Sequence, residues 1–181
     1  KLPFQPTAGA AAQNDTLYIP SLGSAVNNKT IESFSLVNGA RGWGYRTTSE
    51  VFTSPAVGGD VGDPKLYFVT RTGHVICMDA NNYGYSPSGP RWEELVEAGV
   101  QFPLFVTPDD RGEVGAVFVV DNDGVVYCLD RITGARRWNN ATGRLPVSGA
   151  QVFGNIVVAK MKSGLIGYES HNVFYVLTVA K

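Results

Sequence analysis

The sequence predicts an all-β protein, a β-propeller of about four antiparallel blades with three or four strands in each. A short run of β-branched and aromatic residues recurs along the chain, and successive runs are spaced by roughly 40 to 50 residues, the period of propeller blades. Gly, Asn and Asp lie between the runs, which favours strands joined by tight turns over helices. One such sheet cannot cover both of its own faces, so neighbouring units are expected to stack radially.

The recurring runs divide the chain into units. Their central residues, which we align as equivalents, are Leu17, Leu66, Val117 and Ile156. We predict a single propeller domain over residues 1–181, with units of roughly 4–53, 54–102, 103–148 and 149–181. Residues 4–12 are one source of a strand that would close the ring by joining the last unit.

The third unit contains the clearest copy of a turn motif. Residues 126–138 read Val-Tyr-Cys-Leu-Asp-Arg-Ile-Thr-Gly-Ala-Arg-Arg-Trp, which is a strand, a Thr-Gly turn and a second strand that carries a tryptophan. The Gly-Ala-Arg-x-Trp ending returns in the first unit at Trp43, and a looser Pro-Arg-Trp ending returns in the second unit at Trp92. Because Trp92 aligns with Trp138, the helix-like residues 91–97 are predicted to form a strand.

This pattern resembles the tryptophan-docking repeat of pyrroloquinoline-quinone-type (quinoprotein-like) β-propellers, in which a strand, an Asp, a Thr-Gly turn and a Trp recur in each blade. The resemblance implies that Trp43, Trp92 and Trp138 dock between blades, each against a small residue near the end of the preceding strand. The small residues assigned to that position are Ser35, Cys77, Cys128 and Gly167. The two cysteines are then buried spacers, and a disulfide between them is the alternative.

The turn Asp121-Asn122-Asp123-Gly124 has the composition of the opening of a calcium loop, because two carboxylates and an amide precede a glycine. Ile132 occupies the position at which such a loop ends in a bidentate Glu. A hairpin turn is therefore the preferred interpretation, since Gly tolerates the positive φ of a tight turn.

No other motif indicates a reaction. Neither His74 nor His171 has a second ligand at the spacing of a zinc site, and the glycines of residues 58–62 lack the Lys-Ser/Thr of a phosphate loop. Acidic residues assigned to loops between units, which could gather on one face of the propeller, are Asp60, Asp63, Asp109, Asp110 and Glu113. We predict no catalytic, cofactor-binding or metal-binding residue.

Composition argues against two classes of partner. Lys and Arg number 15 and Asp and Glu number 16, so no basic surplus is present to neutralise nucleic-acid phosphates or an anionic membrane. No run approaches the roughly 18 apolar residues of a membrane helix. Sequons at Asn14, Asn28 and Asn140 would accept N-glycans on a secretory route, and together with the start at Lys1 they predict an extracellular or periplasmic location.

We predict a non-catalytic scaffold or protein-interaction module. The resemblance implies it, because non-enzymatic members of the family present loops and strand edges to protein partners. Its quinone-dependent enzymes have about eight blades and a calcium-binding acid set that this chain does not match. The alternatives are a fragment or half-ring of a quinone-dependent dehydrogenase, with pyrroloquinoline quinone and calcium as cofactors, and a carbohydrate-binding propeller. A protein partner is expected, or a second copy of this chain, and the apparent insertion at residues 81–89 is a candidate contact loop.

Overall fold

The computed structural model describes residues 5–22, 30–60, 62–80, 88–109, 115–153, 156–162, 164–169 and 174–175. Within these ranges the chain forms sixteen strands and no helix. The strands make four antiparallel sheets of four strands each, as the sequence predicts. Strand β8 (Trp92–Leu95) occupies the segment with helix-like composition, and the prediction of a strand there is confirmed.

Each sheet takes four consecutive strands in chain order. The first sheet contains β1 (Ala11–Gln13), β2 (Thr16–Ser21), β3 (Thr30–Ser35) and β4 (Arg41–Arg46). The second contains β5 (Ala56–Asp60), β6 (Asp63–Val69), β7 (His74–Asp79) and β8. The third contains β9 (Phe105–Val106), β10 (Ala116–Val120), β11 (Val125–Asp130) and β12 (Arg136–Ala141). The fourth contains β13 (Pro146–Phe153), β14 (Ile156–Met161), β15 (Gly164–Glu169) and β16 (Phe174–Tyr175).

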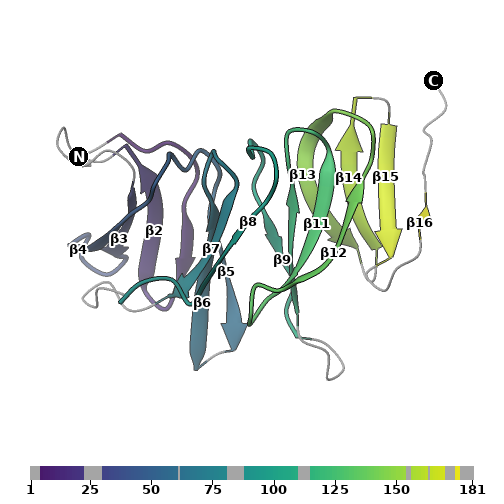
Figure 1. The fold of residues 1–181 in the computed structure, drawn as a ribbon. Coiled ribbons are helices and arrows are strands. Elements are labelled where there is room, and N and C mark those ends of the chain that lie inside the picture. The colour runs from purple at the N-terminus through teal and green to yellow at the C-terminus, as the bar shows by residue number, and fades with distance from the viewer. Residues whose placement is uncertain are drawn as a thin grey trace.

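The four sheets follow one another in a row, from the purple first sheet to the yellow-green last sheet (Figure 1). Neighbouring sheets contact each other through their first strands, since β1 contacts β5, β5 contacts β9 and β9 contacts β13. The later strands of each sheet lie progressively farther from this line of contact. This is the radial stacking expected of propeller blades.

An apolar layer fills the space between each pair of neighbouring sheets, because a strand directs alternate side chains to opposite faces. The layer between the first and second sheets includes Tyr18, Ile31, Trp43, Leu66, Phe68 and Met78. The layer between the second and third includes Tyr67, Val75, Cys77, Trp92, Val117 and Leu129. The layer between the third and fourth includes Phe118, Val126, Cys128, Val157, Ala159 and Met161. Each fully buried large side chain contributes roughly 1.5 to 3 kcal/mol, so the sheets stabilise one another.

A two-residue turn at the start of the chain corrects one prediction. Asn14 and Asp15 both have positive φ, of 49° and 58°, which Asn and Asp tolerate better than most residues. The turn folds the preceding segment back along its own sheet, where the amide of Thr7 donates to a carbonyl oxygen of β2. The prediction that residues 4–12 supply a strand to the last unit is therefore wrong for residues 5–12, and position 4 lies outside the described residues.

The strand register corrects one alignment. Leu66 and Val117 each lie in the apolar layer against the preceding sheet. In the fourth sheet this position belongs to Val157, which lies in the layer against the third sheet. Ile156, the predicted equivalent, is its neighbour in β14, and successive side chains of a strand point to opposite faces. A shift of one residue therefore places Ile156 on the other face of the fourth sheet.

Candidate functional site

The most conspicuous polar residue of the repeated motif, Asp130, stabilises its own turn. Its Oδ1 accepts hydrogen bonds from the backbone amide of Ile132 and from both the amide and the hydroxyl of Thr133, at 2.8 to 3.0 Å. Its Oδ2 accepts a hydrogen bond of 2.8 Å from Arg137. Burial opposes the charge, but the bonds from Arg137 and Thr133 outweigh it and lower the pKa of Asp130 to about 2. All these contacts lie within one sheet.

The second unit repeats the ion pair of this motif. Arg91 directly precedes Trp92, as Arg137 precedes the tryptophan of the third unit. Its Nη2 lies 2.6 Å from Oδ2 of Asp79, the residue that ends β7. The arginine before the tryptophan therefore binds the carboxylate at the end of the neighbouring strand in both units.

In the first unit Ser35 takes the place of this aspartate. The prediction that Ser35 is the small residue against Trp43 is therefore wrong. The Oγ of Ser35 accepts hydrogen bonds from the amides of Val37 and Asn38, as Oδ1 of Asp130 does in its turn. The residue that contacts Trp43 is Ser33, whose Oγ bonds to both the backbone nitrogen and the backbone oxygen of that tryptophan, at 2.8 and 3.2 Å. The turn sets this register and the sequence alignment missed it.

Trp92 joins the second sheet to the third. Its Nε1 donates a hydrogen bond of 3.1 Å to the backbone carbonyl oxygen of Arg131, in the β11–β12 turn. Its indole lies against Gly134, where an added Cβ would approach the ring to 2.6 Å. Gly134 also has a φ of 74°, a conformation that glycine adopts at little cost. The Thr-Gly turn of the motif is thus the surface on which the tryptophan of the preceding sheet rests.

The other two tryptophans lie in corresponding apolar layers. Trp43 lies between the first and second sheets, and Trp138 packs between the third and fourth. Trp43 is buried, with its ring centroid 5.8 Å from that of Tyr18. Trp138 is half-buried, with its ring centroid 6.0 Å from that of Phe118. Residues 81–87, between β7 and β8, and residues 170–173, between β15 and β16, lie outside the described residues. The docking role of the three tryptophans stays a prediction, for which mutation is the test.

Both cysteines are free and buried. In the strand register Cys77 stands opposite Trp92, and Cys128 stands opposite Trp138. They lie in two different apolar layers, so the alternative of a disulfide between them is wrong. Burial raises the pKa of each thiol to about 12, so neither is a thiolate nucleophile at neutral pH.

The calcium-like turn is built around a buried carboxylate. Oδ1 of Asp121 accepts hydrogen bonds from the amides of Asp123 and Val125, and Oδ2 accepts a bond of 3.0 Å from the hydroxyl of Tyr127. Gly124 has a φ of 79°, as a tight turn between strands requires. The carboxylate thus stabilises the β10–β11 hairpin.

The remaining predicted residues lie in three sheets, and Asp60, Asp63 and Asp109 come together around the pocket that Arg131 lines. Asn14 is exposed in the β1–β2 turn and Asn140 is half-buried in β12. Asp60 and Asp63 end and begin the strands of one hairpin, and Asp109 lies between β9 and β10, so these acids lie within sheets and not between units. Predicted positions outside the described residues are Asn28, residues 81–87, Asp110, Glu113 and His171.

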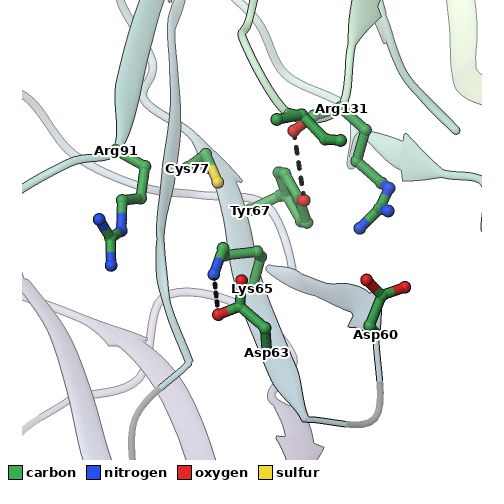
Figure 2. Close-up of a pocket in the computed structure, with 8 residues that line it drawn as sticks. Asp60, Asp63, Lys65, Tyr67, Cys77, Arg91 and Arg131 are labelled. Carbon is green, nitrogen blue, oxygen red and sulfur yellow. Dashed lines mark hydrogen bonds and ion pairs between the residues drawn. The ribbon is translucent and has the colours of Figure 1, made fainter. Parts of the chain in front are cut away.

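A pocket of about 280 Å³ opens where the second and third sheets meet. Figure 2 shows Arg91 and Arg131 on opposite sides of it, with Tyr67 and Cys77 between them. Tyr67 and Cys77 are fully buried, whereas Ile132 is exposed at the edge. The complete lining is Asp60, Asp63, Lys65, Tyr67, Cys77, Arg91, Arg131 and Ile132.

Ion pairs hold the cations of the pocket in place. Lys65 pairs with Asp63 and, at 3.0 Å, with Asp79, which also binds Arg91. The Arg131 side chain is only 5 % exposed, and its Nε and Nη2 donate to Oδ1 of Asp109 at 3.2 and 2.7 Å. The guanidinium also interacts with the hydroxyl of Tyr67, which donates a hydrogen bond of 3.4 Å to the backbone carbonyl oxygen of Arg131.

Arg131 lies within the repeated motif, and the motif assigns it no role. The residue follows Asp130, and the residues that follow the equivalent Ser35 and Asp79 are Leu36 and Ala80. The sequence does contain one signal for Arg131: it is a charged residue at a turn position where the first and second units have an apolar residue.

Among the described residues, no helix is long and apolar enough to cross a membrane.

Comparison with known proteins identifies the repeat. The family model described as outer membrane protein assembly factor BamB matches residues 12–140, and no curated protein sequence matches the chain. BamB from Moraxella catarrhalis has a TM-score of 0.71 at 20 % identity, over 94 % of this chain and 49 % of BamB. The chain thus spans about half the length of that BamB chain.

Two computationally designed proteins share the fold as well. Ika4 has a TM-score of 0.62 at 17 % identity, over 93 % of this chain and 93 % of the designed chain. Ika8 has a TM-score of 0.61 at 18 % identity, over 94 % of this chain and 46 % of the designed chain. At these identities the likeness concerns the fold alone, and the predicted β-propeller is confirmed.

Proposed function

We propose that this chain, which belongs to the pyrroloquinoline-quinone-type repeat family of the outer membrane protein assembly factor BamB, is a non-catalytic scaffold for a protein partner. The resemblance read from the tryptophan-docking repeat is thereby confirmed. The proposal treats residues 1–181 as one propeller domain and places it outside the cytoplasm, for which the family supplies the support.

One observation carries the proposal: the conspicuous side chains of the repeat already hold structural contacts. Asp130 is bonded to its own turn and to Arg137, and Trp92 rests on the turn of the next sheet. Cys128 is buried in an apolar layer. A catalytic group must be free to contact a substrate, whereas these side chains are already hydrogen-bonded or packed within the sheets.

The connections between sheets offer a surface for a partner. Phe52 and Leu145 are large apolar residues that are exposed in these connections, and Val147 is exposed in β13, close to the second of them. They lie at the same end of their sheets, because every sheet has four antiparallel strands in chain order and the connections leave from equivalent ends. Exposed aromatic and aliphatic side chains of this kind suit the buried centre of a protein interface.

Affinity purification of the tagged chain from its native host tests this surface. We expect a stoichiometric partner to be retained by the native chain and lost by the double variant Phe52→Glu/Leu145→Glu. The matched control is Val37→Glu, which changes an exposed apolar residue at the other end of the sheets. Equal retention by both variants would contradict the proposed surface, and a failure to retain any protein would contradict the scaffold function.

Two simple measurements address the alternatives. Addition of pyrroloquinoline quinone with calcium should produce no bound-cofactor absorbance, whereas a stoichiometric absorbance together with dye reduction would favour the half-ring of a dehydrogenase. The mass in solution separates a monomer from a pair of copies, and a dimer would make a second copy the first partner to consider.

A further inference from the structure

We propose that the end of the sheets at which the connections lie binds an acidic segment of a protein partner, in which carboxylates flank apolar side chains. The connections are residues 47–55, 96–104 and 142–145, and we call this the connection end. The inference rests on the proposed scaffold function, because it names the chemistry of the partner at the surface that carries Phe52 and Leu145.

The connections and the hairpin turns at this end form one continuous surface. The amide of Arg71, in the β6–β7 turn, donates a hydrogen bond of 2.7 Å to the carbonyl oxygen of Glu50 in the first connection. The carbonyl oxygen of Arg71 accepts a bond of 3.2 Å from the amide of Val100 in the second connection. In the same way the amide of Lys162, which follows β14, donates to the carbonyl oxygen of Leu145 in the third. These bonds hold the exposed side chains in fixed positions, as a binding surface requires.

The basic side chains of the connection end lack the ion pairs that basic side chains at the other end possess. At the other end, the cations that pair with carboxylates are Arg41, Lys65, Arg91, Arg131 and Arg137. At the connection end, the cations without an ion pair to any carboxylate that the structure describes are Arg46, Arg71, Arg144 and Lys162. A partner's carboxylates would therefore meet cations that no described acid neutralises.

Few acids at the connection end compete for these cations. Asp121 is buried and bonded within its own hairpin, and Oε1 of Glu97 lies 3.6 Å from Nη1 of Arg136. Two further acids among the described residues are Glu50, which is half-buried, and Asp123, which is exposed in the β10–β11 turn. The cations without ion pairs therefore outnumber these two acids, which favours an acidic partner over a basic one.

The exposed apolar side chains of this surface lie beside its cations. The guanidinium of Arg71 lies over the ring of Phe52, with Cζ 5.9 Å from the ring centroid. The backbone bond between Lys162 and Leu145 places a second cation next to a second apolar residue. Phe52 is 44 % exposed and Leu145 is 52 % exposed. Aromatic and Arg side chains contribute most of the binding energy at many protein interfaces, so a segment with acidic and apolar residues matches both parts of this surface.

Nucleic acids and anionic membranes also attract cations, but they match this surface less well. Both depend on many basic residues that neutralise phosphates together, or on a dense cluster of them. Here the cations are spread from the first sheet, at Arg46, to the fourth, at Lys162, and Asp123 lies between them in the chain. A polypeptide is therefore the class of partner that the surface favours.

Two synthetic peptides test this chemistry. The probe is Asp-Leu-Glu-Phe-Asp-Leu-Glu with blocked termini, and its match has lysine in place of every acid. In nuclear magnetic resonance titrations of the whole chain, the acidic peptide should shift the amide signals of Arg71, Val100 and Lys162 and leave those of Gly39 and Gly134 in place. It should bind at least roughly tenfold more tightly than the basic peptide, and its affinity should fall at high salt because exposed charges are screened. Equal binding of the two peptides, or no shift from the acidic one at millimolar concentration, would overturn the inference.

Charge variants with a matched control locate the contact. Arg71→Gln/Lys162→Gln removes two cations from the connection end and should weaken binding of the acidic peptide by roughly fivefold or more. Val37→Glu/Ile132→Glu lowers the net charge by the same amount at the other end and should leave the affinity nearly unchanged. All four residues are exposed, so both variants are expected to fold. An equal loss in the two variants would show attraction by net charge alone and would contradict the proposed surface.

The same variants separate this inference from the scaffold function. A native partner that is lost by Phe52→Glu/Leu145→Glu but retained in full by Arg71→Gln/Lys162→Gln would leave the scaffold function standing and overturn the acidic segment. Failure to retain any native protein would contradict the scaffold function, while the peptide titrations would still decide the chemistry of the surface. Tighter binding of a short oligothymidylate, or of phosphatidylglycerol vesicles, than of the acidic peptide would overturn the choice of a polypeptide.

Discussion

The indole nitrogen of Trp92, in the second sheet, lies 3.1 Å from the backbone carbonyl oxygen of Arg131, in the third. The same residue therefore contributes its carbonyl to the contact between sheets and its guanidinium to the pocket beside it. Asp109 fixes the side chain while Trp92 fixes the main chain. The contact between the second and third sheets thus positions a residue that lines the pocket.

Replacement of Trp92 measures the contact between sheets. Trp92→Ala should lower the free energy of unfolding by about 3 to 5 kcal/mol, since it removes a large buried ring and leaves a cavity. Trp138→Ala should act in the same direction. Trp92→Phe keeps most of the ring and should cost less, because it loses chiefly the hydrogen bond, about 1 kcal/mol. Urea unfolding provides the measurement, and unchanged midpoints would contradict the docking role.

Alanine substitutions at two glycines with similar backbone conformations distinguish the cost of backbone strain from the cost of a steric clash with the Trp92 ring. Gly134 has a φ of 74° and lies under the Trp92 ring, whereas Gly143 has a φ of 65° and has nothing within 4 Å of an added Cβ. Gly143→Ala should cost about 1 to 2 kcal/mol, the penalty of the left-handed conformation. Gly134→Ala should cost clearly more, because the methyl group also meets the indole. Equal losses in thermal unfolding would show that the ring gives way.

Asp130 should make stability depend on acid pH. Its folded pKa is about 2, below the value of roughly 3.9 in an unfolded chain. The stabilisation is therefore fully present above about pH 4 and is lost as the pH falls toward 2, with a total of about 2 kcal/mol. Unfolding of native chain and of Asp130→Asn, measured from pH 6 to pH 2, should differ most at pH 6. Parallel curves would contradict this assignment, and Arg137→Gln should reproduce part of the loss.

The two cysteines should be inert in the folded chain. Burial raises the pKa of each thiol to about 12, and reaction with a disulfide reagent requires an exposed thiolate. At pH 8 we expect no thiol to react before unfolding and both to react in denaturant. Rapid labelling of the native chain would show that one interface between sheets opens easily, and single Cys→Ser variants would identify which.

Sequence reasoning succeeded where the signal was local and repeated. Two examples are the Thr-Gly turn before Trp138 and the Asp-Gly hairpin at residues 123–124. Each needs a glycine with positive φ between two strands, and the residues beside the glycine predict such a turn. The alignment was wrong at Ser35 and Ile156, because similar residue types do not distinguish strand registers that differ by one or two positions. At Ser35 the hydrogen bonds of the turn decided the register, and at Ile156 the face that meets the third sheet decided it.

Local patterns are enough to identify this chain as a set of small antiparallel sheets from the tryptophan-docking repeat family, because strand, turn and tryptophan recur at regular spacing. The packing of the sheets sets which carbonyl oxygen accepts the hydrogen bond of Trp92, which acid binds Arg131, and where a pocket opens between two sheets. These contacts join residues far apart in the chain. Their partners are set by how neighbouring sheets pack, which no local pattern encodes.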